Sequence, residues 1–248
     1  MLSYQHIYHA GGLADVHKHA ALARMLKRIA ANGPVCTYVE THAGRGLYDI
    51  HCAEQQKTRE AERGILALDD GRSPLLPAPY REAIAAARAV HGRRIYPGSP
   101  VIAQILLRPT DPIYLAELHP REFKALKHDV RGRGIWVEQV DGFELAARVL
   151  PPRQGRGFLF IDPSYEIKSD YEQVASFVRQ MHAKDPKLMI LIWYPILGAG
   201  LHQVLAEMLE ADRPSRYEKD EIEFPEQISP RLKGSGLIGI NMPERLVN

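Results

Sequence analysis

From residue 100 onward the chain alternates short apolar runs with amphipathic stretches. The apolar runs are typical of strands buried on both faces, and the amphipathic stretches have the period of helices. The pattern predicts helices over 101–107, 121–130, 143–149, 171–182 and 201–210, and strands over 113–117, 135–140, 157–161, 188–193, 215–224 and 237–241. Because each crossover helix covers a sheet face, this order indicates an α/β fold with a doubly wound parallel sheet.

The first hundred residues add one helix, one strand and an insertion. A helix is expected over 15–31, with Asp15 as its N-cap, and a strand over 35–40. Residues 57–92 predict two helices separated by a proline-rich break, without a strand pattern. We therefore expect a single domain, 1–248, with a small helical insertion at about 52–95.

Composition limits location and partners. Hydrophobic residues make up 45% of the 248 residues and charged residues 25%, as in ordinary globular proteins. The net charge of +2 is too small to indicate a nucleic-acid partner by itself. The sequence has no signal-peptide pattern, no apolar run of the roughly 18 residues that a membrane span needs, and no disulfide or zinc spacing of its two cysteines. We expect a cytoplasmic monomer that does not bind membranes.

Polar residues follow the first three predicted parallel strands. In an open parallel sheet, ligands bind outside the carboxyl ends of the strands. The glycine-containing loop 40–46 allows close approach of a ligand, Glu117 could accept hydrogen bonds from ribose hydroxyls, and Asp141 before Gly142 could accept one from an adenine amine. Each also has a structural explanation: a turn, a solvated glutamate, and an N-cap.

The fourth strand leads into Asp162-Pro163-Ser164-Tyr165. Asp162 and the Pro163 carbonyl could accept the two hydrogens of an exocyclic amine, and Tyr165 could stack on the base. The alternative is an Asp-Pro turn with a packing tyrosine. Taken together, the strand ends predict an adenosyl cofactor beside a flipped base that carries an amine.

Six of the eleven histidines lie within the first 51 residues: His6, His9, His17, His19, His42 and His51. Asp15, His17, His19 and His42 could form a zinc or iron site. It is disfavoured because residues 17 and 19 point to different sides of a helix. Histidines also bind nucleotides, so Tyr4 and His6 are candidate RNA contacts, and Lys18 and His19 could reach a cofactor carboxylate.

Several short motifs resemble one family, the RlmJ-type 23S ribosomal RNA adenine-N6 methyltransferases, which were earlier linked to the use of external DNA. The similar segments are Met1-Leu2-Ser3-Tyr4-x-His6-x-x-His9-Ala10-Gly11, Ala14-Asp15-Val16-x-Lys18-His19, Thr41-His42-Ala43-Gly44-x-Gly46, Tyr96-Pro97-Gly98-Ser99-Pro100, Glu117-Leu118-His119-Pro120, Asp141-Gly142-Phe143 and Ile161-Asp162-Pro163-x-Tyr165-Glu166. The resemblance covers residues 1 to about 243.

The resemblance implies a class I methyltransferase, Rossmann-like fold with a helical insertion, and S-adenosylmethionine as the methyl donor. The cofactor contacts that it implies are Lys18, His19, His42, Ser99, Glu117, Asp141 and Gly142. It implies Asp162 as the catalytic acceptor and Tyr4 as an RNA contact. The chain departs from the family in two places: Ser164 replaces a second proline, and the chain stops earlier than its relatives, so an incomplete sheet edge is expected.

We therefore expect methyl transfer from S-adenosylmethionine to the N6 amine of an adenine in 23S ribosomal RNA. Asp162, Pro163 and Tyr165 would serve catalysis, and Tyr4, His6 and Tyr165 would bind the RNA. The remaining alternatives are a metal-dependent nuclease and a nucleic-acid-binding protein acting in external DNA use; a nicotinamide oxidoreductase lacks its glycine fingerprint. RNA affinity is expected from Arg121, Lys124, Lys127, Arg131, Arg133, Arg153 and Arg156, although these could equally form solvated helix faces.

Overall fold

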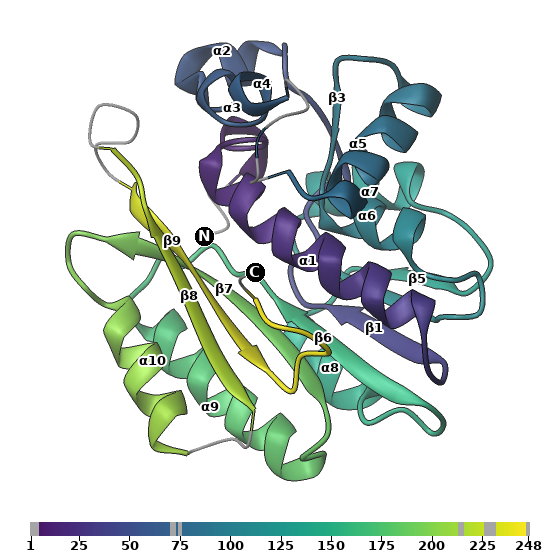
Figure 1. Ribbon diagram of the computed structural model, residues 1–248, viewed down its shortest axis with the longest axis vertical. Helices are drawn as coiled ribbons and strands as arrows, with labels where there is room; N and C mark the ends of the chain where they lie inside the picture. The colour runs from purple at the N-terminus through teal and green to yellow at the C-terminus, as the bar shows by residue number, and fades with distance from the viewer. Residues whose placement is uncertain (1–4, 70–72, 74–75, 213–215, 226–231, 247–248) are drawn as a thin grey trace.

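A seven-stranded, mostly parallel sheet forms the centre of the protein (Figure 1). The structure is a computed structural model that describes residues 5–69, 73, 76–212, 216–225 and 232–246. The strand order is β5-β4-β1-β6-β7-β9-β8, and only β9 and β8 run antiparallel to their neighbours. The strands are β1 (Cys36–Glu40), β4 (Ile113–Ala116), β5 (Ile135–Glu138), β6 (Arg156–Ile161), β7 (Met189–Leu197), β8 (Tyr217–Glu223) and β9 (Leu232–Ile240). The predicted α/β fold is confirmed.

Two predicted strands are longer in the structure. β7 continues to Leu197, and β9 begins at Leu232 instead of residue 237. The extra part of β9 holds Gly234 and Gly236, which weaken a strand pattern in sequence. Gly236 is needed there because an added Cβ would lie 2.1 Å from the Tyr194 ring. The edge that was expected to be incomplete is formed by β9 and β8.

Helices cover both faces of the sheet (Figure 1). α1 crosses one face, while α8, α9 and α10 lie against the other. The helices that follow the strands are α6 (Ser99–Leu106), α7 (Pro120–Asp129), α8 (Gly142–Val149), α9 (Ser169–Lys184) and α10 (His202–Ala211), and α1 spans Leu13–Ala31. None of the helices among the described residues is both apolar and long enough to cross a membrane.

The predicted cap of α1 is wrong. The N-cap is Gly12, and Asp15 lies inside the first turn with only 2% of its surface exposed. Its carboxylate accepts a hydrogen bond from the Gly11 backbone N–H at 2.9 Å. Asp15 therefore satisfies a backbone donor ahead of the helix, as a cap would, but from a buried position that also faces other polar side chains.

Four helices lie between β1 and α6, where the insertion was expected. They are α2 (Ala53–Thr58), α3 (Glu60–Arg63), α4 (Ile65–Leu68) and α5 (Ala78–His91). The sequence pattern predicted two helices, because the three short ones are interrupted by a left-handed Arg59 and by Gly64. Gly64 lies against the chain ahead of α1, since an added Cβ would be 2.2 Å from the Gly11 carbonyl oxygen.

A small antiparallel pair frames these helices. β2 (Leu47–Asp49) pairs with β3 (Ile95–Pro97) as a separate two-stranded sheet. Strands of three residues are too short for an alternating pattern to reveal, so the sequence missed both. Ahead of α1, His6–Tyr8 forms a single 3₁₀ turn, η1. The pair brings the ends of the 52–95 segment back together at the sheet.

Candidate active site

A pocket of about 940 Å³ opens at the carboxyl ends of the parallel strands. It lies where the strand order reverses, between β1 and β6, the position at which open α/β sheets bind ligands. Its walls come from the loops after β1, β4, β5 and β6, from one side of α1, and from α2 and α3. Ten of the predicted site residues line it: His6, Lys18, His19, His42, Ser99, Glu117, Asp141, Gly142, Asp162 and Pro163.

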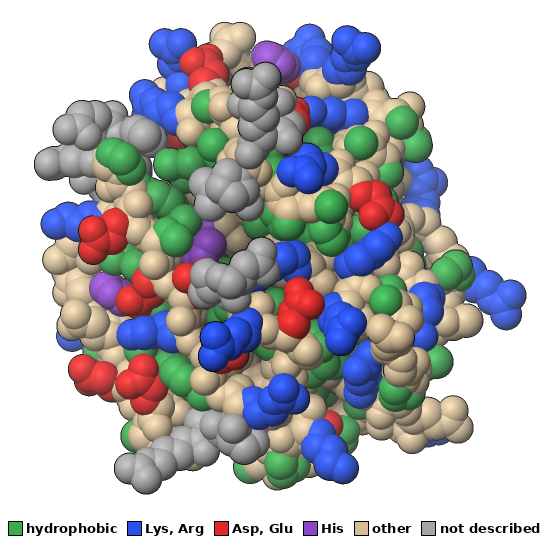
Figure 2. All heavy atoms as spheres, in the orientation of Figure 1, with side chains coloured by type: hydrophobic (Ala, Val, Ile, Leu, Met, Phe, Trp, Pro, Cys, Tyr) green, Lys and Arg blue, Asp and Glu red, His purple; other side chains and the backbone are tan. Residues whose placement is uncertain are grey.

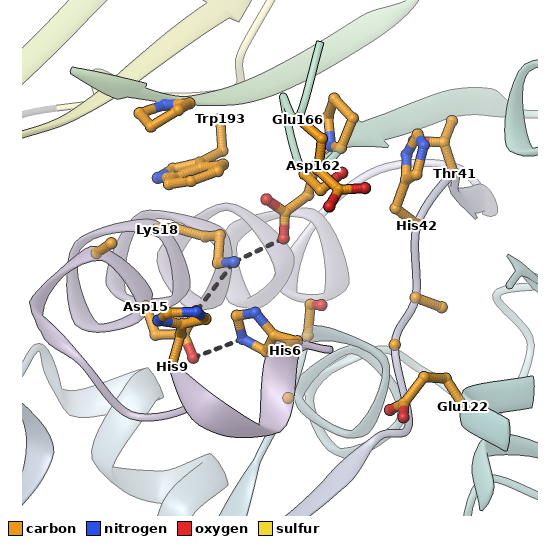
Figure 3. Close-up of a pocket in the computed structure, with 18 of the residues that line it drawn as sticks. His6, His9, Asp15, Lys18, Thr41, His42, Glu122, Asp162, Glu166 and Trp193 are labelled. Atoms are coloured by element: carbon orange, nitrogen blue, oxygen red, sulfur yellow. Dashed lines mark hydrogen bonds and ion pairs between the residues drawn. The ribbon is translucent and has the colours of Figure 1, made fainter. Parts of the chain in front are cut away.

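A buried ionic network occupies the floor of the pocket (Figure 3). The Lys18 ammonium donates to Asp162 Oδ2 at 2.6 Å and lies 2.9 Å from Asp15 Oδ1. His6 Nε2 is 2.9 Å from the other Asp15 oxygen. Lys18 is 3% exposed, so its charge depends on these two carboxylates for compensation. The network ties α1 to the end of β6.

The network sets the ionisation of its members. Burial works to lower the pKa of Lys18, but the charges of Asp15 and Asp162 outweigh burial and hold that pKa above its ordinary value. Burial raises the pKa of Asp162, and the Lys18 ammonium opposes this rise. Asp162 Oδ1 accepts no hydrogen bond from the described residues. One carboxylate oxygen is thus fixed by Lys18, and the other is left for a ligand.

Three of the predicted cofactor contacts lie at the ends of β4 and β5. Glu117 accepts hydrogen bonds from the backbone N–H groups of Gly44, at 2.8 Å, and His119, at 2.7 Å. Asp141 Oδ1 caps α8, as the structural explanation predicted, while its second oxygen accepts nothing among the described residues. Gly142 allows α8 to approach the first loop, because an added Cβ would lie 2.0 Å from the Thr41 carbonyl oxygen.

Two of the histidines that line the pocket, His19 and His42, are neutral because they are buried. Burial lowers the pKa of His19 to about 3 and that of His42 to about 4. His19 Nδ1 lies 2.6 Å from the Tyr96 hydroxyl, which in turn lies 2.7 Å from the Tyr80 hydroxyl on α5. His42 Nδ1 is 2.8 Å from Thr41 Oγ1. Both rings therefore have fixed orientations, and α5 contributes to that of His19.

Ser99 lines the pocket but its hydroxyl donates to Glu40, at the end of β1. Glu40 is fully buried and also accepts a hydrogen bond from the Tyr38 hydroxyl at 3.0 Å. Burial raises the pKa of Glu40 to about 8. Ser99 therefore presents its oxygen lone pairs, and not its proton, to a ligand.

Tyr165, one of the two aromatic residues predicted to contact RNA, does not line the pocket. Tyr165 is 5% exposed, and its hydroxyl donates to the Trp193 carbonyl oxygen at 2.9 Å. Its ring packs against Tyr171, with 4.4 Å between ring centroids. This arrangement matches the alternative of a packing tyrosine, and base stacking by Tyr165 would need the turn to move. Tyr4 lies outside the described residues.

Trp193, in the middle of β7, lines the pocket and was not predicted. The Lys18 ammonium lies 5.0 Å from its ring centroid (Figure 3). Aromatic side chains are the usual partners of bases outside a duplex. The sequence carries no signal for this role, because an aromatic residue inside an apolar run is typical of a buried strand.

The insertion also contributes to the pocket, through Lys57 and Thr58 of α2 and Glu60 and Arg63 of α3. Glu60 Oε1 lies 2.8 Å from His9 Nδ1, which joins the insertion to the segment before α1. This role was not predicted, because the contacts depend on how the insertion packs. Two cationic residues thereby lie at the pocket wall opposite the strands.

The proposed metal ligands do not converge. Among the described residues, no group of three or more histidine, cysteine or acidic side chains could hold a metal ion. His17 contacts Ser235 and Asp220, on the opposite side of α1 from the pocket floor, and His19 contacts Tyr96. The different directions of residues 17 and 19 are as predicted from helical spacing.

The predicted basic residues do not form one patch. Arg121 lies in the first turn of α7, next to the cap residue His119, which lines the pocket. Arg133 and Arg153 precede β5 and β6, at the opposite ends of the strands. On the face seen in Figure 2, Lys and Arg side chains are scattered, with acidic side chains among them. Only the start of α7 brings predicted basic groups to the pocket edge.

Comparison with known proteins agrees with this geometry. The model of the family described as ribosomal RNA large subunit methyltransferase D, RlmJ, matches residues 33–248. Ribosomal RNA large subunit methyltransferase J of Escherichia coli is 34% identical over 257 residues, covering 99% of this chain and 89% of the relative. The Haemophilus influenzae protein of the same name is 32% identical, covering 98% and 88%. The chain belongs to this family.

A solved structure supports the same assignment. The crystal structure of a Legionella pneumophila protein superposes with a TM-score of 0.84, at 31% identity, over 95% of this chain and 88% of that one. The methyl donor of this methyltransferase family is S-adenosylmethionine. The pocket fits such a group, because Glu117 and Asp141 offer carboxylate oxygens for hydroxyl and amine donors. Gly142 lets α8 pack against the Thr41 backbone, which brings the ends of β1 and β5 together at the pocket.

Proposed function

We propose that this protein transfers the methyl group of S-adenosylmethionine to the N6 amine of an adenine in 23S ribosomal RNA. The observation that carries the proposal is the state of Asp162: one oxygen is held by Lys18, and the other faces the pocket without a partner among the described residues. Family membership supports a large-subunit ribosomal RNA as the substrate. Such a substrate implies a cytoplasmic site of action.

In this proposal, the residues at the ends of β4 and β5 hold the donor. Glu117 accepts hydrogen bonds from its ribose hydroxyls, and the second oxygen of Asp141 accepts one from its adenine amine. Gly142 allows the backbone to approach, and His19, His42, Ser99 and Lys18 surround the remainder. When bound, the donor supplies a methyl group on a positively charged sulfur.

The acceptor amine lies against Asp162 and the Pro163 carbonyl. An adenine amine is a weak nucleophile because its lone pair is delocalised into the ring. Two hydrogen bonds from N6, to Asp162 Oδ1 and to the Pro163 oxygen, favour a tetrahedral nitrogen whose lone pair is available. Transfer would form the N–C bond, break the bond between the methyl carbon and the sulfur, and leave S-adenosylhomocysteine. One N6 proton becomes acidic as the N–C bond forms, and Asp162 is placed to accept it.

Trp193 forms the adjacent wall for the acceptor base. It lines the pocket beside Lys18 and Asp162, whereas Tyr165 packs behind it and holds its carbonyl oxygen. His6 and the start of α7 lie at the pocket, where a polynucleotide would pass. Catalysis then depends on positioning and electrostatics, which place the amine and keep the Asp162 carboxylate ionised.

The test is transfer of a labelled methyl group to unmodified 23S ribosomal RNA, followed by identification of the modified nucleoside. The wild-type protein should form N6-methyladenosine. Asp162→Ala should retain binding of S-adenosylhomocysteine, measured by calorimetry, and lose transfer by a factor of about 100 or more. Asp212→Ala, at an exposed ion pair with Arg179, is the matched control. Wild-type transfer by Asp162→Ala, or methylation of another atom, would refute the proposal.

A further inference from the structure

A chain of hydrogen bonds joins three elements to the indole of Trp193. The Trp193 Nε1–H group donates to Ser235 Oγ at 2.8 Å. Ser235 Oγ lies 2.8 Å from His17 Nδ1, and His17 Nε2 lies 3.0 Å from Asp220 Oδ2. These residues come from β7, β9, α1 and β8, so the chain links the helix to all three strands at one side of the sheet. We call it the Trp193 relay.

The direction of every hydrogen bond in the relay is fixed by its two ends. An indole nitrogen can only donate, and an ionised carboxylate can only accept. Ser235 is fully buried, and its oxygen accepts the indole N–H group. A neutral His17 that donates from Nε2 to Asp220 can only accept at Nδ1, so the single Ser235 proton goes to His17 Nδ1. His17 then carries its proton on Nε2 and donates it to Asp220. Every donor of the relay has an acceptor, so the relay holds the indole in one orientation.

A hydrolytic role for this Asp-His-Ser arrangement is excluded by its geometry. Ser235 has no exposed surface and does not line the pocket, so no substrate carbonyl could reach its oxygen. The same oxygen is occupied by the indole N–H group. His17 is 8% exposed, and only Asp220, with 17% of its side chain exposed, reaches the surface. The relay ends at the indole, so Trp193 is the group on which it acts.

Trp193 is also fixed through its backbone. Its carbonyl oxygen accepts the Tyr165 hydroxyl at 2.9 Å, and Tyr165 belongs to the turn that follows Asp162. The Lys18 ammonium lies over the indole ring at 5.0 Å while donating to Asp162. The indole is therefore held at both ends and lies next to the two charged groups that the acceptor amine would meet.

We propose that His17, Ser235 and Asp220 are positioning residues that hold Trp193 in place beside Lys18 and Asp162 for the acceptor base. The expected effect on methyl transfer rests on the proposed function. The expected effect on the orientation of the indole does not. The residues touch neither donor nor acceptor; they act through the indole. Their loss should lower the rate of methyl transfer to RNA and leave the affinity for S-adenosylhomocysteine unchanged.

The indole itself reports on the relay. The chain has two tryptophans, Trp193 and the exposed Trp136, so an amide correlation spectrum contains two indole N–H signals. Trp136→Phe assigns them. Ser235→Ala and His17→Gln should shift the Trp193 signal and speed its exchange with solvent. Ser169→Ala, at the exposed start of α9, is the matched control and should leave the signal in place.

Replacing Asp220, which is half-buried, removes the hydrogen bond between Asp220 and His17 Nε2. Asp220→Ala should lower kcat for methyl transfer about 2- to 10-fold, the range expected for one lost hydrogen bond. Asp220→Asn keeps an oxygen that accepts the His17 Nε2 proton, and it should restore most of this loss. A role of the carboxylate charge alone predicts that both variants are equally impaired, which would overturn the relay.

The outcomes separate the relay from the proposed function. An unmoved Trp193 indole signal in Ser235→Ala, or a shifted signal with unchanged kcat, overturns the positioning role. A loss of cofactor affinity in parallel with kcat also overturns it, because it indicates a general structural defect. If the wild-type protein transfers no methyl group to RNA, the proposed function fails, whereas the spectrum still decides whether the relay holds the indole.

Discussion

Replacing Lys18 with methionine tests the buried ionic network of the pocket floor. The substitution keeps the length and apolar character of the side chain but removes the only cation within hydrogen-bond distance of both Asp15 and Asp162 in the described part of the chain. The three side chains are 3%, 2% and 11% exposed. Breaking a buried ion pair on one side costs about 3–5 kcal/mol, because the remaining charge is uncompensated. We expect Lys18→Met to lose about this much free energy of unfolding at pH 8.

The loss should depend on pH in a predictable direction. Burial alone would raise the pKa of Asp15, but the charges of His6 and Lys18 hold it well below its usual range. In the wild type, ionised Asp15 therefore contributes stability above its unfolded pKa of about 3.9, and this contribution is lost only as pH falls through the lower folded value. Without Lys18, both carboxyl groups have raised pKa values and become protonated more easily. The deficit should be largest at pH 8 and smaller at pH 5.

The assay is urea unfolding of both proteins at pH 5, 6.5 and 8, followed by circular dichroism. Lys27→Met is the matched control on the same helix, because Lys27 pairs with Glu82 at a site where both side chains are about half exposed. Such surface pairs contribute about 0–1 kcal/mol. A Lys18→Met deficit as small as that of Lys27→Met, or one that grows toward pH 5, would refute the reasoning.

Three further substitutions test other parts of the site. Gly142→Ala should destabilise the protein by about 1–3 kcal/mol and abolish calorimetric binding of S-adenosylhomocysteine, because the methyl group would meet the Thr41 carbonyl oxygen; unchanged binding would contradict this. Burial raises the pKa of Glu40 to about 8, so its contribution to the free energy of unfolding should fall as pH rises from about 4.3 toward 8. Glu40→Gln should remove this contribution; the same slope of unfolding free energy against pH in both proteins would contradict this. Arg121→Ala should reduce the salt dependence of RNA binding by about one unit of slope, and Arg153→Ala, at the far ends of the strands, should not.

The sequence predicted the fold and most of the pocket for a common reason. Parallel strands covered on both faces must be apolar, so the polar residues that follow them stand out at the sheet edge where ligands bind. Glu117, Asp141 and Asp162 were found by this rule, and all three line the pocket. Trp193 was missed because an aromatic residue within an apolar strand is not distinguished from the strand itself.

Other features depend on contacts that no local pattern contains. Tyr165 was expected to face a ligand. Whether it faces the pocket or packs behind the pocket wall depends on its contacts with Tyr171 of α9 and Trp193 of β7. The short strands β2 and β3 exist only as a pair, across a gap of more than forty residues. Asp15 looked like a cap because its type and place fit one, and its burial became visible only with the insertion and β6 in place.

Four buried polar residues of the site lie close together in the sequence because they belong to one helix, α1. Residues 15, 18 and 19 are three and four positions apart and lie on the same side of the helix, whereas residue 17 lies on the other. All four are buried, because the helix packs against the sheet on one side and the insertion on the other. A buried polar group needs a partner, so Lys18, His19 and His17 are bound by three different distant segments. The partners are Asp162, which follows β6, Tyr96 of β3 and Ser235 of β9, respectively, whereas Asp15 pairs with Lys18 and His6. The helix therefore couples the insertion, the strand ends and the Trp193 relay, and a substitution on either side of it should be felt in the pocket.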